Sequence, residues 1–147
     1  MAMENSNLTI ESGRDTITFT FPSTMDHIDE VIIEAIDYLY LKMVNIKKHA
    51  FSINLVLREG LTNAVRHGNL SNPEKNVKLL LDVSENPIVK FAIEDQGDGF
   101  NWQEAKENDL PEDEDHGRGI IIIDSYFSSY TYNDKGNILF LEKDTSE

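Results

Sequence analysis

The sequence predicts a single α+β domain in which helices cover one face of a mixed β-sheet. A length of 147 residues suits one domain, and 39% hydrophobic with 27% charged residues is ordinary for a folded soluble chain. Strand-like and helical periods both occur, in the order strand, two helices, two strands, loop, helix and two strands, which favours helices packed on one sheet. The domain is placed at residues 15–147, after a polar N-terminal tail at 1–14.

The first strand is predicted over residues 15–21, DTITFTF, where apolar residues alternate with threonine. Pro22 ends this strand. Ser23 or Thr24 is then expected to cap a helix that runs to about Val44. One apolar stripe supports that helix, formed by Ile28, Val31, Ile32, Ala35, Leu39 and Met43.

A second helix is predicted over about 50–67, with Gly68 as its C-terminal stop. Residues 71–75, SNPEK, are typical of a turn. The two alternating segments after this turn, 76–84 and 87–95, are expected to pair as an antiparallel hairpin.

The remaining elements are a loop, an apolar segment and a hairpin. Residues 101–116 are polar, acidic and interrupted by Pro111, which predicts a short helix that leads into a mobile loop. Residues 117–127 are predicted to begin a helix or a buried segment. Residues 130–143 alternate across an Asn-Asp-Lys-Gly turn, which predicts a final hairpin.

Composition excludes several classes of function. The chain has no cysteine, which excludes disulfides, thiol catalysis and cysteine-held metal sites. Its formal charge of −14 opposes phosphate contacts, so no nucleic-acid partner is expected. No apolar stretch suits a signal peptide or a membrane span, so we expect a cytoplasmic protein without a membrane partner. A nucleotide would need a metal ion, a helix N-terminus or backbone amides to overcome the charge.

A polar row runs along the second predicted helix, because Glu59, Asn63 and His67 occur at intervals of four. The apolar residues of the helix fall on the opposite side: Ile53, Leu57, Gly60, Leu61 and Ala64. In isolation such a row usually faces solvent, and His67 near the helix end would complement the helix dipole.

Two glycine-rich segments lie beyond the row. Residues 95–99, DQGDG, end a predicted strand, and residues 116–119, HGRG, begin an apolar segment where backbone amides suit an anion. Either segment alone is weak evidence, since glycine occurs in many loops. All three motifs in this order are much harder to produce by chance.

With these motifs the chain resembles a known superfamily. Residues 59–68, EGLTNAVRHG, are similar to the N box of the gyrase, heat-shock chaperone, histidine kinase and mismatch-repair (GHKL) ATPases. The segments 95–99 and 116–119 resemble the first and second glycine boxes of these ATPases. The compact size and the HGRGI form resemble the bacterial anti-sigma factor serine/threonine kinases. The resemblance covers roughly residues 15–143 and implies the two-layer Bergerat ATP-binding sandwich.

The resemblance implies a role for each polar residue of the first two motifs. Asp95 would accept a hydrogen bond from the adenine amino group, as an ionised carboxylate can. Asn63 would ligate Mg²⁺ through its amide oxygen. Glu59, one turn earlier, would be the catalytic general base that takes a proton from an attacking hydroxyl or water.

The glycines also receive roles from the resemblance. Gly97 and Gly99 would let the backbone pass close to the base and hinge a lid at about 101–116. The second glycine box would bind the phosphates of ATP: Gly117 and Gly119 through their amides, and Arg118 as a charge partner.

The function that the resemblance implies is an ATP-binding anti-sigma factor. Such a protein would hold a sigma factor and phosphorylate an anti-anti-sigma partner of the STAS type, and the resemblance leaves open a homodimer. The alternative is a non-catalytic module that grips a regulator in its ATP-bound shape. Glu59 favours the kinase, since a nucleotide sensor has no evident need of a base beside the metal ligand. An unrelated structural α+β protein is the third hypothesis.

Overall fold

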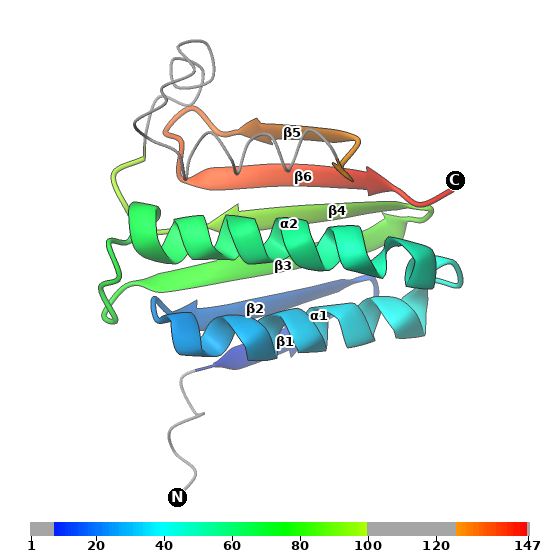
Figure 1. Ribbon diagram of the computed structural model, residues 1–147, viewed down its shortest axis with the longest axis horizontal. Helices are drawn as coiled ribbons and strands as arrows, with labels where there is room; N and C mark the ends of the chain where they lie inside the picture. Colours follow the sequence, from blue (N-terminus) through cyan, green and yellow to red (C-terminus); the bar gives the residue numbers. More distant parts are fainter. Residues whose placement is uncertain (1–7, 100–125, 147) are drawn as a thin grey trace, which may run out of the picture.

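The computed structural model describes residues 8–99 and 126–146 of the chain. Their strands are β1 (Thr9–Ser12), β2 (Thr16–Pro22), β3 (Asn76–Glu85), β4 (Ile88–Glu94), β5 (Ser129–Tyr132) and β6 (Ile138–Asp144). They form one sheet of order β1-β2-β3-β4-β6-β5 (Figure 1). The sequence predicts a mixed sheet, whereas every neighbouring pair in this order is antiparallel. Both predicted hairpins, β3–β4 and β5–β6, are confirmed.

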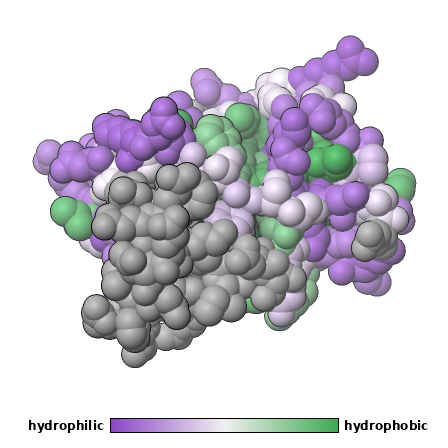
Figure 2. Space-filling model, turned by 90° about the horizontal axis from the view of Figure 1, so that it is seen from above, coloured by the Kyte–Doolittle hydropathy of each residue, from purple (hydrophilic) through white to green (hydrophobic). Residues whose placement is uncertain are grey.

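Two helices cover one face of the sheet, as predicted (Figure 1). They are α1 (Ile28–Lys42) and α2 (Ala50–Asn63), and a π-helical turn, Ala64–Gly68, extends α2. The apolar stripes of both helices and the inward side chains of the strands form one buried cluster. Among the described residues, none of the helices combines the length and the apolar character that a membrane-spanning segment needs. On the face seen in Figure 2, hydrophilic side chains surround small apolar areas.

One row of paired side chains crosses the sheet from the core to the cavity beside the end of α2. Phe19 lies opposite Leu79, Leu79 opposite Ile93, and Ile93 opposite Leu139. Leu139 lies in turn opposite Tyr132 on β5. Because directly paired residues share a face, the last members of this row form the floor of a site under the helix.

The start of α1 differs from the prediction. The helix has no side-chain cap and comes after a short 3₁₀ turn, Met25–His27. The Ser23 hydroxyl donates instead to the Lys75 carbonyl at 2.6 Å, and the Thr24 hydroxyl lies 2.8 Å from His27 Nδ1. Ser23 is therefore used to join the end of β2 to the start of β3.

The predicted N-terminal tail also needs correction, because residues 9–12 form the edge strand β1. This strand pairs with β2 in register, for example Ile10 opposite Phe19. All four of its residues are exposed, so little side-chain burial marked it in the sequence. Backbone hydrogen bonds to β2 form the strand, and hydrophobic patterning does not reveal bonds of that kind.

Candidate functional site

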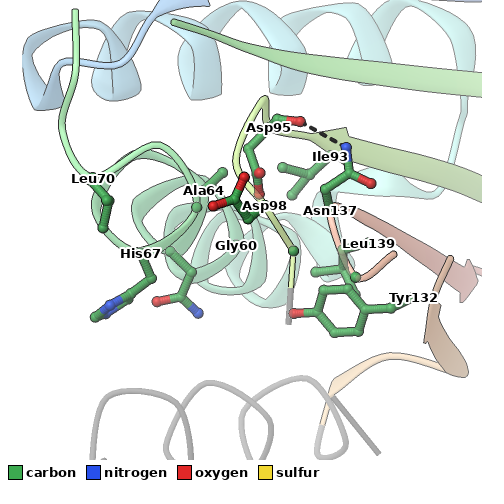
Figure 3. A pocket seen from close by; sticks show the side chains of 14 residues that line it. Gly60, Ala64, His67, Leu70, Ile93, Asp95, Asp98, Tyr132, Asn137 and Leu139 are labelled. Carbon is green, nitrogen blue, oxygen red and sulfur yellow. Dashed lines mark hydrogen bonds between the residues drawn. The ribbon is translucent and has the colours of Figure 1, made fainter. Parts of the chain in front are cut away.

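A cavity of about 270 Å³ opens between the C-terminal end of α2, the end of β4 and the β5–β6 turn (Figure 3). Its floor is apolar and includes Gly60, Ile93 and Leu139. Asn63 and Asp95 bring polar atoms to the lining from α2 and from the end of β4. The cavity therefore combines an apolar base with a few polar groups, as small-molecule sites commonly do.

Gly60 lets α2 approach the sheet closely beside this floor. A Cβ atom at this position would lie only 2.7 Å from the Cδ1 atom of Ile93 and 3.7 Å from Leu139. The glycine thus has a packing role in the interior of a helix, where its flexibility alone would be unfavourable.

The end of α2 departs from α-helical geometry next to the cavity. The Asn69 amide donates to the Ala64 carbonyl at 2.9 Å, and the Ser71 amide donates to the Val65 carbonyl at 2.7 Å. Leu70 and Ser71 then adopt positive φ angles of 54° and 57°. The helical stretch ends at Gly68, the predicted C-terminal stop, whereas the left-handed residues lie two and three positions later.

Asp95 lies between the π-helical turn and the β5–β6 turn. Its backbone amide donates to the Asn137 carbonyl at 2.9 Å, and the Asn137 side-chain amide donates to the Asp95 carbonyl at 3.0 Å (Figure 3). The Asp95 carboxylate accepts a bond of 2.8 Å from the Gly97 amide. Burial raises the pKa of Asp95, although the Gly97 amide lowers it in part.

Two glycines make room for this carboxylate. A Cβ atom at Gly68 would lie 2.2 Å from Asp95 Oδ2, and one at Gly97 would lie 1.9 Å from the Gly68 carbonyl oxygen. Any larger residue at either position would push the chain away from Asp95. Gly68 is the last residue of the π-helical turn, as predicted, and it also has a close-packing role beside Asp95.

Gly99 meets the β5–β6 turn in the same way. Its φ angle is +83°, and a Cβ atom there would lie 1.8 Å from the Lys135 carbonyl oxygen. Both the conformation and the space therefore require glycine.

Asn69 is a buried hub behind Asp95, with no exposed surface. Its side-chain oxygen accepts from the Gln96 amide at 2.7 Å. Its side-chain nitrogen donates to the Ser23 hydroxyl at 2.7 Å and to the Asn76 carbonyl at 2.9 Å. One asparagine thus ties the ends of β2 and β4, the start of β3 and the turn after α2 together.

Asn133 fixes the conformation of the β5–β6 turn, which forms the opposite wall of the cavity. Its side-chain oxygen accepts from three successive backbone amides, those of Gly136, Asn137 and Ile138, each at 3.0 Å. Its side-chain nitrogen donates to Asn137 Oδ1 at 2.8 Å. The turn thereby fixes the amide that bonds to Asp95.

Tyr132 brings a phenol to the cavity, and Figure 3 shows its hydroxyl pointing inward. Burial raises the pKa of Tyr132 strongly, and the negative charges of Asp95 and Glu59 raise it further. Glu59 is half-buried and lies one helical turn before Asn63.

The structure brings several of the predicted residues together. Asn63, Asp95 and Gly99 line the cavity with His67, the last member of the polar row. Glu59 lies outside the lining that the described residues form. Gly97 contributes through its backbone amide, which donates to the Asp95 carboxylate.

The second glycine box falls outside the described residues. This holds for its three predicted site residues, Gly117, Arg118 and Gly119, and for the predicted lid at 101–116.

Four residues that contribute to the cavity or hold its walls were not predicted from the sequence: Asn69, Leu70, Tyr132 and Asn137. Asn137 comes after the predicted Asn-Asp-Lys-Gly turn and precedes a strand, so a polar residue at that position was the available signal. Asn69 comes after the predicted helix stop and gave no signal, because its burial depends on contacts distant in sequence.

Comparison with known proteins agrees with this geometry. Residues 21–143 match the family model described as the histidine kinase-like ATPase domain. The chain is also similar to curated proteins named anti-sigma F factor. The relative from Bacillus cytotoxicus is 37% identical over 78 residues, which are 50% of this chain and 53% of the relative. The one from Priestia megaterium is 31% identical over 98 residues, or 62% of this chain and 67% of the relative.

A third such protein, from Bacillus thuringiensis, is 36% identical over 78 residues, covering 50% of this chain and 53% of the relative. The chain thus spans about half the length of two of these relatives and two thirds of the other. The family model covers most of the chain, including α2, β4 and the β5–β6 hairpin that build the cavity. The chain therefore belongs to the family of histidine kinase-like ATPase domains.

Proposed function

We propose that this chain is a cytoplasmic, ATP-binding anti-sigma regulator that transfers the γ-phosphate of ATP to a serine or threonine of an anti-anti-sigma partner. The observation that carries the proposal is the half-buried Asp95 carboxyl group in an apolar cavity that Asn63 also lines. Membership of an ATPase family supports ATP as the ligand of this cavity. The names of the relatives support the regulatory role and a sigma factor as the second partner.

Asp95 is the proposed reader of the base. An ionised carboxylate accepts the adenine amino group in a charge-assisted hydrogen bond, which guanine could not donate from the same ring position. The two backbone bonds to Asn137 and the close contact with Gly68 hold the carboxylate before the ligand arrives. Such preorganisation reduces the entropy lost on binding.

Asn63 is the proposed protein ligand of Mg²⁺. Its amide oxygen is a hard donor, and Mg²⁺ in nucleotide sites commonly uses one or two protein oxygens together with phosphates and water. Bound Mg²⁺ would neutralise phosphate charge that this acidic chain otherwise repels.

Glu59 is the proposed general base. It would accept the proton of the attacking hydroxyl as the oxygen bonds to the γ-phosphorus and the bond to the β-phosphate oxygen breaks, leaving ADP. Gly117, Arg118 and Gly119 are proposed to bind the phosphates, while Gly97 and Gly99 support the base site and its link to the lid.

The experiment that tests the proposal measures ATP affinity and phosphate transfer in the same variants. Glu59→Gln keeps the size and polarity of the side chain but removes the base. Its ATP affinity should stay within about twofold of the wild type, while phosphate transfer to a co-purified partner falls by about 10²- to 10⁴-fold. Asn63→Ala should lose both Mg²⁺-dependent binding and transfer.

The matched control is Glu34→Gln, which changes an exposed glutamate of α1 and should alter neither quantity. Wild-type transfer rates in Glu59→Gln would refute the assigned base. If the wild type binds ATP and a partner but transfers no phosphate, the chain is the non-catalytic binding module.

A further inference from the structure

We propose that Leu70 is an apolar contact for the purine base, which the bound nucleotide covers. This inference rests on the proposed function and adds to it a residue outside the three sequence motifs. Leu70 lines the cavity at the end of α2, and Figure 3 places it at the rim on the helix side with His67.

The backbone at Leu70 is the first observation. Its φ angle of 54° lies in the left-handed region, which strongly favours glycine or asparagine over a branched apolar residue. Helices often end on one left-handed residue, and glycine is the usual choice. The fold therefore requires the conformation but does not require leucine.

The exposure of the side chain is the second observation. Leu70 is 77% exposed, so it contributes little to the core that could compensate for its conformation. The hydrogen bonds that close this turn come from the backbone amides of Asn69 and Ser71, and glycine at position 70 would leave them intact. No packing in the described residues explains a leucine here.

The position supplies the explanation. Leu70 is the neighbour of Asn69, the hub that holds the Gln96 amide beside Asp95, so its place relative to the proposed base reader is fixed. Ile93 and Leu139 lie in the floor of the cavity, where they would contact one side of a planar ligand. A leucine at the rim would contact the other side, and both contacts would remove apolar surface from water.

The test uses the full chain and titrates it with ADP. Leu70→Gly should bind ADP about tenfold more weakly, because an apolar side chain that the base partly buries is lost. Its unfolding temperature without nucleotide should be unchanged or higher, because glycine relieves the strained φ angle. Leu70→Met, which can restore an apolar contact, should bind within about twofold of the wild type.

Ser71→Gly is the matched control. It relieves the neighbouring left-handed residue, whose φ is 57° and which lies outside the cavity lining. It should not change ADP affinity. In addition, the methyl resonances of Leu70 should shift upfield with ADP, from the ring current of the base, and should not do so with inorganic tripolyphosphate.

Three outcomes would overturn the inference. ADP binding by Leu70→Gly with wild-type affinity would remove the contact while leaving the proposed function in place. Equal losses in Leu70→Gly and Ser71→Gly would assign the effect to the backbone of the turn. Failure of the wild type itself to bind ADP and ATP would refute both this inference and the proposed function.

Discussion

Asp95, the proposed contact of the adenine base, shows at the scale of one side chain how a residue placed for binding can oppose stability. Burial raises its pKa, so at neutral pH the fold holds a carboxylate that would be more stable in water. We expect Asp95→Asn to raise the unfolding temperature slightly at pH 7 while weakening ATP binding by about 10- to 100-fold, the loss of one charge-assisted hydrogen bond. Calorimetry of unfolding and of binding measures both effects, and unchanged ATP affinity would reject Asp95 as the base reader.

Protonation of Asp95 should make both the stability of the fold and the affinity for ATP depend on pH. Because the folded pKa lies above the ordinary value of 3.8, Asp95 destabilises the fold when ionised. The stability that it removes should return as pH falls through the raised pKa, since the folded state then binds a proton before the unfolded chain does. ATP affinity should fall over the same range, because the protonated group no longer accepts from the base. Asp95→Asn should flatten this part of the affinity profile, and an identical profile in both proteins would contradict the assignment.

Asn69 should matter for stability before any ligand binds. Asn69→Ala removes the buried partners of the Gln96 amide and the Ser23 hydroxyl, so it should cost about 2–4 kcal/mol and lower the unfolding temperature by roughly 5–15 °C. The control is Asn72→Ala, which loses one exposed bond to the Glu74 amide and should cost less than about 0.5 kcal/mol. Equal costs in thermal unfolding would show that burial of the hub is unimportant.

At the scale of elements, the close approach of α2 to β4 depends on one glycine. Gly60→Ala places a methyl group 2.7 Å from Ile93 Cδ1, so it should cost about 1–3 kcal/mol although alanine is the better helix former. Adding Ile93→Val removes that Cδ1 atom and should recover at least about half of the cost. Urea unfolding of both single variants and the double variant measures the coupling. Additive costs would mean that the two residues do not collide.

The elements themselves could be predicted because their patterns are local. Alternation marked β2, β3, β4 and β6, and helical stripes marked α1 and α2. The pattern failed for β1, whose residues are all exposed, and for the cap of α1, because Ser23 bonds to the distant Lys75 carbonyl. Long-range hydrogen bonds leave no period in the sequence.

In the candidate site, too, residues in local motifs could be predicted and residues held by long-range contacts could not. Asn63 and Asp95 were found because they belong to short motifs at the ends of a helix and a strand. Asn69 and Asn137, which hold Asp95 in place, lie 26 and 42 residues from it along the chain. Their roles appear only once the sheet order brings those segments together.

At the scale of the whole molecule, charge should govern how ADP arrives. The formal charge of −14 repels an anionic nucleotide over distances that salt screens. Raising KCl from about 20 mM to about 200 mM should therefore increase the association rate of ADP by about two- to fivefold. Adenosine, which is uncharged, is the control and should show no such increase in stopped-flow measurements. A slower association of ADP at high salt would mean that local positive charge at the site outweighs the net charge.

The place of β6 between β4 and β5 has a consequence for synthesis on the ribosome. When the chain has emerged only as far as β5, the edge of β4 is still unpaired, and Asn137 and Leu139 have not yet reached the cavity. If the cavity is the ATP site, as proposed, ATP would not stabilise such a nascent chain, because Leu139 of the floor and Asn137 of one wall are missing. The exposed edge of β4 could instead pair with chaperones or with other nascent chains. We therefore expect that the pairing of residues 138–144 with β4 both covers the exposed strand edge and completes the cavity.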